Sequence, residues 1–436
     1  MTGGICGICS KDWDCLSRLF NMTLDIQDRG QEYCGISTNN GQRIGIRTHH
    51  GLVGPSFVND LVGLEGHLGI GVTHSRERQP MSYYEKNRIW FTVGFDGYLT
   101  NADQLRDELT RGGNSFVTPD SVEIVASLIG QEDDIAQGIK QALGKIEGPC
   151  SLVLLSKEGI YAARNAMKPL VTGRGKDQKG NIWAVASESC AFGINSGVEL
   201  IADVEPGKVV LINPDGISVV EEFISPITQI CIFEWIYYAN PNSIIEGTSV
   251  ALARQAWGKM LAENDDIPAD IVGAVPNSGI CYAEGYHLTS GLPSLEIFLP
   301  LRDGRRTYII PTVTERKLTK KRKLVPMIAN VQGNKVVVVD DSIRSGITLT
   351  DLIELLNNSG SLANHLRIGS PPSIRDCPWA PPPQQEEKFI AADYNLEEIR
   401  QRLGADSLRY QDLARVHQAI PTVDKESFCL DCFLRQ

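Results

Sequence analysis

The first 230 residues alternate short apolar runs with turns that contain glycine. Runs at 68–75, 89–95, 150–156 and 208–213 have the length of β-strands. Helical periodicity interrupts them at 102–109, 121–130 and 134–146. This pattern predicts stacked antiparallel sheets with helices on the outside.

From about Cys231 the pattern changes, and strands begin to alternate with helices. The expected order is helix 249–264, strand 270–276, a strand-like run 295–300, strand 335–341 and helix 348–360. Such alternation is typical of a parallel α/β sheet. A chain of 436 residues also exceeds what one hydrophobic core usually serves, so two domains are expected.

The stretch VVVVDDSIRSGIT, residues 336–348, combines a buried strand with polar chemistry. A continuous valine run is typical of a strand covered on both faces, and the carboxyl ends of parallel strands are where α/β folds bind ligands. Asp340 and Asp341 at that end can hold vicinal ribose hydroxyls or Mg2+. Ser345, Gly346 and Thr348 then open a helix whose free N–H groups can hold a phosphate. For the bare Asp-Asp-Ser alone, a solvated turn is an equally good interpretation.

The full stretch resembles the phosphoribosyl-pyrophosphate (PRPP) signature of type I phosphoribosyltransferases. LDIQDRGQEYCGI, CIFEWIYYANPNSIIEGTSVALAR, AVPNSGICYAEGY, ERKLTKKRKLVP and FCLDCF extend the resemblance to the glutamine PRPP amidotransferase family over nearly the whole chain. It implies an α+β N-terminal-nucleophile hydrolase sandwich, the class II glutamine amidotransferase fold, at 6–230. An α/β type I phosphoribosyltransferase domain would follow at 231–436, and residues 1–5 would be a propeptide.

The resemblance implies a pentosyltransferase that makes 5-phosphoribosylamine and pyrophosphate from PRPP and glutamine-derived ammonia, for purine biosynthesis. Mg2+ would be held by Ser278, Asp340 and Asp341. The residues that the resemblance assigns to PRPP are Arg306, Lys321, Lys323, Asp340, Asp341, Ser342, Arg344, Ser345, Gly346 and Thr348. The clustered cations suit a reaction whose cost lies in the charge that develops on the leaving pyrophosphate.

For the glutaminase half, the resemblance makes Cys6 the nucleophile, with its own α-amino group as base once residues 1–5 are removed. Cys9 is a rival that lacks the following Gly-Ile. Asp120 would bind the α-amino group of glutamine. The family's arginine falls on His74, with Arg76 two residues further on.

The family's His-Asn-Gly-Asn oxyanion stretch reads Phe95-Asp96-Gly97-Tyr98 here. Gly97 keeps its place, but a carboxylate at Asp96 would repel an oxyanion, and losing one such donor costs roughly 2.7–4 kcal/mol. The hypothesis that follows is a weak or lost glutaminase, with the transferase using free ammonia or another amine acceptor. A further alternative is a non-catalytic PRPP-sensing regulator.

Cysteines Cys429 and Cys432 stand in CxxC spacing, which alone is compatible with zinc, a cluster or a redox pair. Members of the resembled family that carry a cluster draw two further ligands from the positions of Cys231 and Cys377. All four being present implies a structural 4Fe-4S cluster, with tetrahedral zinc on the same thiolates as second choice.

A formal charge of -11 argues against a nucleic-acid backbone or an anionic membrane as main partner. No stretch approaches about 18 uninterrupted apolar residues, and no secretory signal is recognised. We therefore expect a cytoplasmic enzyme without a membrane segment, and the resemblance implies a homo-dimer or homo-tetramer.

Overall fold

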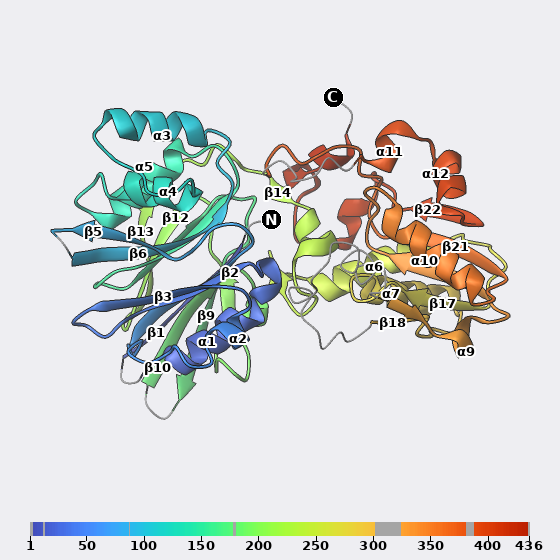
Figure 1. Ribbon diagram of the computed structural model, residues 1–436, viewed down its shortest axis with the longest axis horizontal. Helices are drawn as coiled ribbons and strands as arrows, with labels where there is room; N and C mark the ends of the chain where they lie inside the picture. The colour runs from blue at the N-terminus through green and yellow to red at the C-terminus, as the bar shows by residue number, and fades with distance from the viewer. Residues whose placement is uncertain are drawn as a thin grey trace, which may run out of the picture.

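The computed structural model describes residues 3–11, 14–86, 88–177, 180–300, 324–380 and 388–434. Figure 1 shows two lobes side by side, the first running from blue to green and the second from yellow to red. The predicted Arg306, Lys321 and Lys323 lie outside the described residues.

The first lobe is a sandwich of two antiparallel sheets (Figure 1). In order across the first sheet stand β11 (Glu199–Asp203), β9 (Val171–Asp177), β10 (Gly180–Ala186), β1 (Gly3–Ser10), β4 (Leu68–His74), β2 (Tyr33–Asn39) and β3 (Ile44–His50). The second sheet holds β13 (Gly216–Glu222), β12 (Lys208–Asn213), β8 (Ile160–Arg164), β7 (Cys150–Leu155), β6 (Arg88–Gly97) and β5 (Met81–Glu85). The predicted antiparallel arrangement is confirmed.

Apolar side chains alternate along these strands and so supply a core on each face. Ile5, Ile70 and Val153 pack between the sheets. The outer faces are covered by α1 (Leu16–Asp25), α2 (Val53–Ser56), α3 (Ala102–Arg111), α4 (Ser121–Ile129) and α5 (Ile135–Lys145). Short turns η1 (Gln27–Arg29) and η2 (Ser189–Ala191) lie beside α1.

The second lobe is built on a parallel sheet in the order β17 (Ile271–Ala274), β20 (Lys335–Asp340), β21 (Ala363–Ile368) and β22 (Ser407–Tyr410). Its helices are α6 (Val250–Ala262), α7 (Ile280–Ser290), α9 (Ile328–Val331), α10 (Ile347–Asn358), α11 (Ile390–Asp393) and α12 (Leu396–Leu403). The valines of β20 are fully buried, as a strand with neighbours on both sides requires. The carboxyl end of β20 therefore opens at the middle of the sheet.

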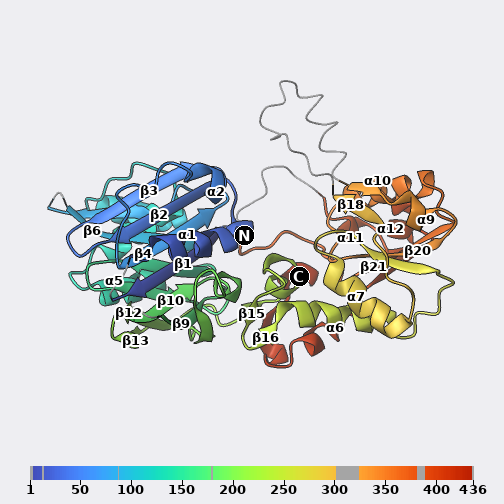
Figure 2. The same ribbon diagram turned by 90° about the horizontal axis from the view of Figure 1, so that it is seen from below.

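The predicted strand at 295–300 does not join the parallel sheet. Its end forms β18 (Phe298–Pro300), which pairs with β19 (Leu324–Pro326) in a separate antiparallel pair rather than in the parallel sheet. Two other short pairs, β14 (Ile230–Cys231) with β23 (Phe428–Cys429) and β15 (Ile244–Ile245) with β16 (Thr248–Ser249), lie near the junction of the lobes (Figures 1 and 2). Remaining turns are η3 (Glu234–Tyr238), η5 (Val416–Ala419), η6 (Lys425–Ser427) and η7 (Asp431–Phe433).

Among the described residues, none of the helices has both the length and the apolar character needed to cross a membrane.

Candidate functional site

Two buried carboxylates stand at the carboxyl end of β20. Asp340 and Asp341 are 8% and 4% exposed. The hydroxyl of Ser278 donates to Asp340 Oδ1 at 3.3 Å, and the Asp341 backbone N–H donates to the same oxygen at 2.9 Å. Burial, followed by the negative charge of Asp341, raises the pKa of Asp340 well above its usual value. Like charges buried this close favour a site that takes up a cation.

The loop after these acids is shaped by a single glycine. Gly346 caps the start of α10 with φ of +80°, a left-handed conformation that glycine adopts without strain. A Cβ at this position would also come within 2.9 Å of Leu403 Cδ2. Ser342 Oγ donates to Asp341 Oδ2 at 2.5 Å, which ties the loop back to the carboxylates. The N–H groups at the start of a helix favour an anion such as phosphate.

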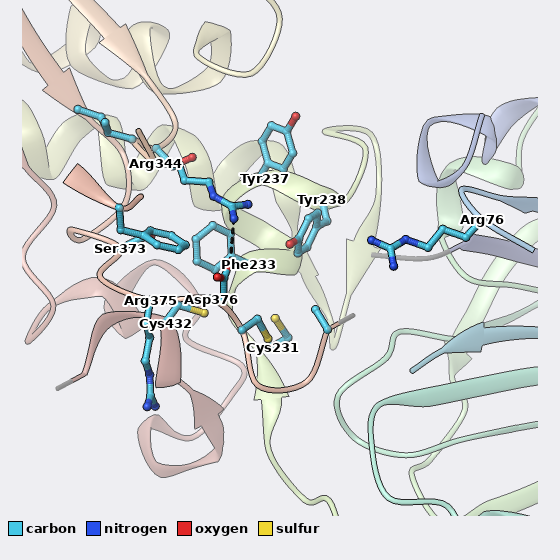
Figure 3. Close-up of a pocket in the computed structure, with 15 residues that line it drawn as sticks. Arg76, Cys231, Phe233, Tyr237, Tyr238, Arg344, Ser373, Arg375, Asp376 and Cys432 are labelled. Atoms are coloured by element: carbon cyan, nitrogen blue, oxygen red, sulfur yellow. Dashed lines mark hydrogen bonds and ion pairs between the residues drawn. The ribbon is translucent and has the colours of Figure 1, made fainter. Parts of the chain in front are cut away.

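Arg344 of this loop lines a pocket between the lobes. Its guanidinium pairs with Asp376 at 2.8 Å and lies 4.8 Å from the centre of the Phe389 ring. The pocket has a volume of about 340 Å3, and Figure 3 shows Arg76 entering it from the first lobe, opposite Arg344 and Tyr238. Arg76 was predicted to bind glutamine, and in the structure it lines the same pocket as Arg344.

Tyr237 is a site residue that the sequence analysis missed. It lines the same pocket and is half-exposed. Burial, and then the charges of Asp341 and Asp340, raises its pKa, so its hydroxyl lies in the field of the two carboxylates. The apolar-aromatic run EWIYY of η3 carries no polar pattern that would have singled it out.

In the first lobe, two residues of the predicted glutaminase site, His74 and Asp96, meet at Gly3. Its backbone N–H donates to Asp96 Oδ1 at 3.0 Å. A Cβ on Gly3 would stand 2.6 Å from His74 Cδ2 and 2.6 Å from the carbonyl oxygen of Thr73. The imidazole of His74 therefore fills the space that a side chain at position 3 would need.

Cys6 does not have the position expected of the nucleophile. It lies in the middle of β1, opposite Gly71 and Ala186. Its thiol is fully buried against Thr23 of α1, on the helix side of the sheet, and burial raises its pKa to about 12. Asp96 lies on the other sheet of the sandwich. This placement does not favour the predicted role, because the thiol faces α1 and not Asp96.

Two other predicted residues of the first lobe, Asp120 and Gly97, stand at the ends of secondary-structure elements. Asp120 precedes α4 at the surface, with a backbone hydrogen bond from Arg78, and burial raises its pKa. Gly97 ends β6, where a Cβ would come within 2.4 Å of the Pro149 carbonyl oxygen. It lines a small cavity of about 50 Å3 together with Lys168.

A buried ion network surrounds Asp96. Lys168 Nζ lies 2.9 Å from Asp96 Oδ1, and Arg29 lies 3.6 Å from Oδ2. Arg29 also pairs with Glu188 at 2.6 Å and with Glu234 of η3, in the second lobe, at 3.0 Å. All five side chains are at least nine-tenths buried. The sequence analysis did not identify Arg29, Lys168, Glu188 and Glu234. Their ion-pair partners lie far away in the chain, so no local motif indicates the pairing.

His74 gives a pH prediction. Its Nδ1 accepts hydrogen bonds from the backbone N–H groups of Arg76 and Glu77, and no described residue pairs with its Nε2. Burial lowers its pKa from 6.5 to about 4. The unfolded chain therefore binds the proton first, and the contribution of His74 to stability, present above pH 6.5, is lost as pH falls toward 4.

Replacing His74 by asparagine, which can still accept these hydrogen bonds, should remove that dependence. Between pH 7 and 4 the wild type should lose on the order of 2–3 kcal/mol more unfolding free energy than H74N. Urea denaturation of both proteins across that range measures the difference. Parallel pH profiles would contradict the assignment.

Four cysteines from three distant segments gather at the junction of the lobes. Cys231 and Cys429 are partners in the β14–β23 pair. A hydrogen bond from Cys432 lowers the pKa of Cys377 to about 7, and that contact raises the pKa of Cys432. The segment that carries Cys377 is fastened to the C-terminal tail, since Arg375 Nε donates to the Asp431 carbonyl at 2.6 Å and Ile374 N–H donates to the Cys432 carbonyl at 2.9 Å.

No three His, Cys, Asp or Glu side chains stand in a ready metal-binding geometry within the part of the chain that the structure describes. To bind a metal ion or a cluster, the side chains of the paired acids of β20, or of the four cysteines, would therefore have to move closer together.

Comparison with known proteins covers almost the whole chain. A glutamine amidotransferase domain family matches residues 66–193. An amidophosphoribosyltransferase of Archaeoglobus fulgidus is 34% identical over 98% of this chain and 96% of its own, and one of Bacillus subtilis is 32% identical over 93% and 87%. The solved glutamine PRPP amidotransferase of B. subtilis, complexed with ADP and GMP, superposes with a TM-score of 0.91 at 30% identity, covering 99% of this chain and 96% of the other. The predicted fold class is confirmed.

Proposed function

Because this chain belongs to the amidophosphoribosyltransferase family, we propose that its second lobe binds PRPP and forms 5-phosphoribosylamine and pyrophosphate. The observation that carries the proposal is the pair of buried acids, Asp340 and Asp341, directly before a glycine-opened helix start. The acids suit ribose hydroxyls, and the loop Ser342–Thr348 suits the 5'-phosphate. The predicted roles of Arg306, Lys321 and Lys323 in holding pyrophosphate stay part of this proposal.

Magnesium fits the donor set at this end of the sheet. Asp340, Asp341 and the Ser278 hydroxyl present oxygen atoms, the ligands that Mg2+ prefers. When bound, Mg2+ would neutralise the charge that develops on the departing pyrophosphate. The protein would orient the ribose so that its C1 faces the pocket between the lobes.

In the proposed reaction the lone pair of ammonia forms a bond to C1 of the ribose. The bond from C1 to the pyrophosphate oxygen breaks, and its electron pair leaves with pyrophosphate. The new amine loses one proton to solvent. Tyr237 and Arg344 line the pocket in which this exchange would occur.

The direct test is to mix the protein with PRPP, Mg2+ and ammonium and to measure pyrophosphate. We expect PRPP to bind only with Mg2+ present and pyrophosphate to appear in proportion to ammonium. Binding without any pyrophosphate would favour the regulator alternative and contradict the proposed reaction.

The four cysteines support a structural 4Fe-4S cluster held by Cys231, Cys377, Cys429 and Cys432. Thiolate sulfur is the ligand that such clusters and zinc both use. The cluster would tie the C-terminal tail to the start of the second lobe, since its ligands come from β14, from the segment before Trp379 and from the chain end. A homo-oligomer of two or four chains and a cytoplasmic location remain predictions.

Replacing Cys377 by serine should remove most of the bound metal. Iron, zinc and acid-labile sulfide are measured on anaerobically purified protein, with Cys281→Ser as the matched control because Cys281 lies on α7, outside the group. The cluster is supported if C281S contains as much iron and sulfide as the wild type and C377S loses both. Zinc without sulfide would support the second choice, and a wild type free of both would contradict the metal site.

A further inference from the structure

The place where a glutaminase nucleophile would stand has no side chain. Asp96 and His74, which the resemblance placed in the glutamine site, meet at Gly3 rather than at Cys6. The next residue, Gly4, also lacks a side chain. Gly3 supplies no hydroxyl or thiol, so no covalent intermediate can form at this position.

The space at Gly3 is also closed. A side chain there would collide with the His74 ring and with the backbone oxygen of Thr73, each at 2.6 Å. The neighbouring cavity, lined by Gly97 and Lys168, has about 50 Å3. This cavity alone is too small for a glutamine with its α-amine and α-carboxylate.

Charge opposes hydrolysis in the same place. Asp96 is fully buried and paired with Lys168 and Arg29, so a carboxylate occupies the position expected to stabilise an oxyanion. An amide hydrolysis passes through an oxyanion that needs donors at that position. Arg29 is held in turn by Glu188 and by Glu234 of the second lobe, so the network joins the lobes instead of serving a substrate.

The other thiols near this region do not replace the nucleophile. Cys150 pairs with Gly97 across β6 and β7 and is buried, as is Cys6 on the opposite side of the first sheet. Burial raises the pKa of each to about 12, so neither supplies a thiolate near neutral pH.

We infer that the first lobe does not hydrolyse glutamine and that the transferase takes its nitrogen as free ammonia from solution, through the pocket between the lobes. The inference rests on the proposed PRPP-dependent reaction, and it assigns the nitrogen donor of that reaction. The first lobe then acts as a structural partner, joined to the second by the Arg29–Glu234 ion pair.

The test measures glutamate and pyrophosphate separately, in wild-type protein supplied with PRPP, Mg2+ and either glutamine or ammonium. We expect pyrophosphate with ammonium, and glutamate no higher than in a buffer blank. Glutamate released in step with pyrophosphate would overturn the inference, and Cys6→Ala and Cys150→Ala would then identify the thiol. Pyrophosphate from neither donor would instead overturn the proposed function, and with it the assignment of ammonia.

A second readout does not depend on turnover. A diazoketone analogue of glutamine alkylates an active glutaminase thiolate, and intact mass spectrometry detects the added mass. We expect the mass of the wild-type protein to stay unchanged after incubation with PRPP and Mg2+ present. A single stoichiometric adduct on any cysteine would contradict the absence of a nucleophile.

Discussion

Replacing Asp340 and Asp341 together by asparagine is expected to abolish Mg2+-dependent PRPP binding and to lower pyrophosphate release by roughly 10²- to 10³-fold. The physical reason is that the pair supplies the negative charge that a cation requires, while the amide keeps the shape of the carboxylate. Calorimetric titration with PRPP, with and without Mg2+, measures the binding.

The same variant should keep its fold. Two carboxylates buried this close repel each other, and this repulsion together with burial raises the pKa of Asp340, so we expect the melting temperature of the variant to stay equal or rise. Glu354→Gln, an exposed acid on α10 near the same loop, is the matched control and should bind PRPP normally. A double asparagine variant that binds PRPP within a few-fold of wild type would refute the role of the acids.

Replacing Arg29 by methionine is expected to cost roughly 3–5 kcal/mol of unfolding free energy. Burial opposes the charge of Arg29, but the three carboxylates around it raise its pKa well above the usual value, so the guanidinium stays charged. Its removal takes a cation from all three carboxylates, and Lys168 pairs with Asp96 but not with Glu188 or Glu234 in the ion pairs of the described residues. Chemical denaturation followed by fluorescence measures the loss.

Arg47→Met is the control for that experiment. Arg47 pairs with Asp60 at 3.2 Å, but both side chains are 40% exposed or more. Exposed pairs contribute about 0.2–1 kcal/mol, so the control should lie within that range. Equal unfolding free energies for R29M and R47M would contradict the predicted stabilisation by the buried network.

The candidate transferase loop could be proposed from the sequence because Asp340 to Thr348 are contiguous. One strand, one loop and one helix start lie within 336–348, and a buried valine run already indicates where the carboxyl end of the strand opens. The pairing of Arg344 with Asp376 was not predictable, because it depends on a segment about thirty residues further on whose place is set by the C-terminal tail.

The first-lobe site could not be located from sequence alone. The resemblance of CGI at 6–8 to a family opening pointed to Cys6, but the alternation of a strand turns that thiol toward α1. Only the pairing of β1 with β4 and the approach of β6 bring His74 and Asp96 to Gly3. The signal in the sequence was the carboxylate at Asp96, which already indicated a changed oxyanion site.

Strand β21 was missed because it carries polar residues at buried positions. Arg367 is buried through a two-oxygen pairing with Asp265, at 2.5 and 2.8 Å. The backbone N–H of Asn364 donates to Asp406 Oδ2 at 2.7 Å, and its side-chain amide donates to Asn357 Oδ1 at 2.7 Å and to Ser361 Oγ at 2.9 Å. A buried strand that satisfies its polar groups through distant partners does not show the apolar run that a strand prediction relies on.

An isotope competition tests most directly the claim that the nitrogen of the product comes from free ammonia. The protein is given PRPP, Mg2+, glutamine labelled with 15N in its amide, and unlabelled ammonium, and the phosphoribosylamine is trapped and analysed by mass spectrometry. The account predicts a product that carries only nitrogen from ammonium, formed together with pyrophosphate. A product carrying the amide nitrogen of glutamine would contradict it.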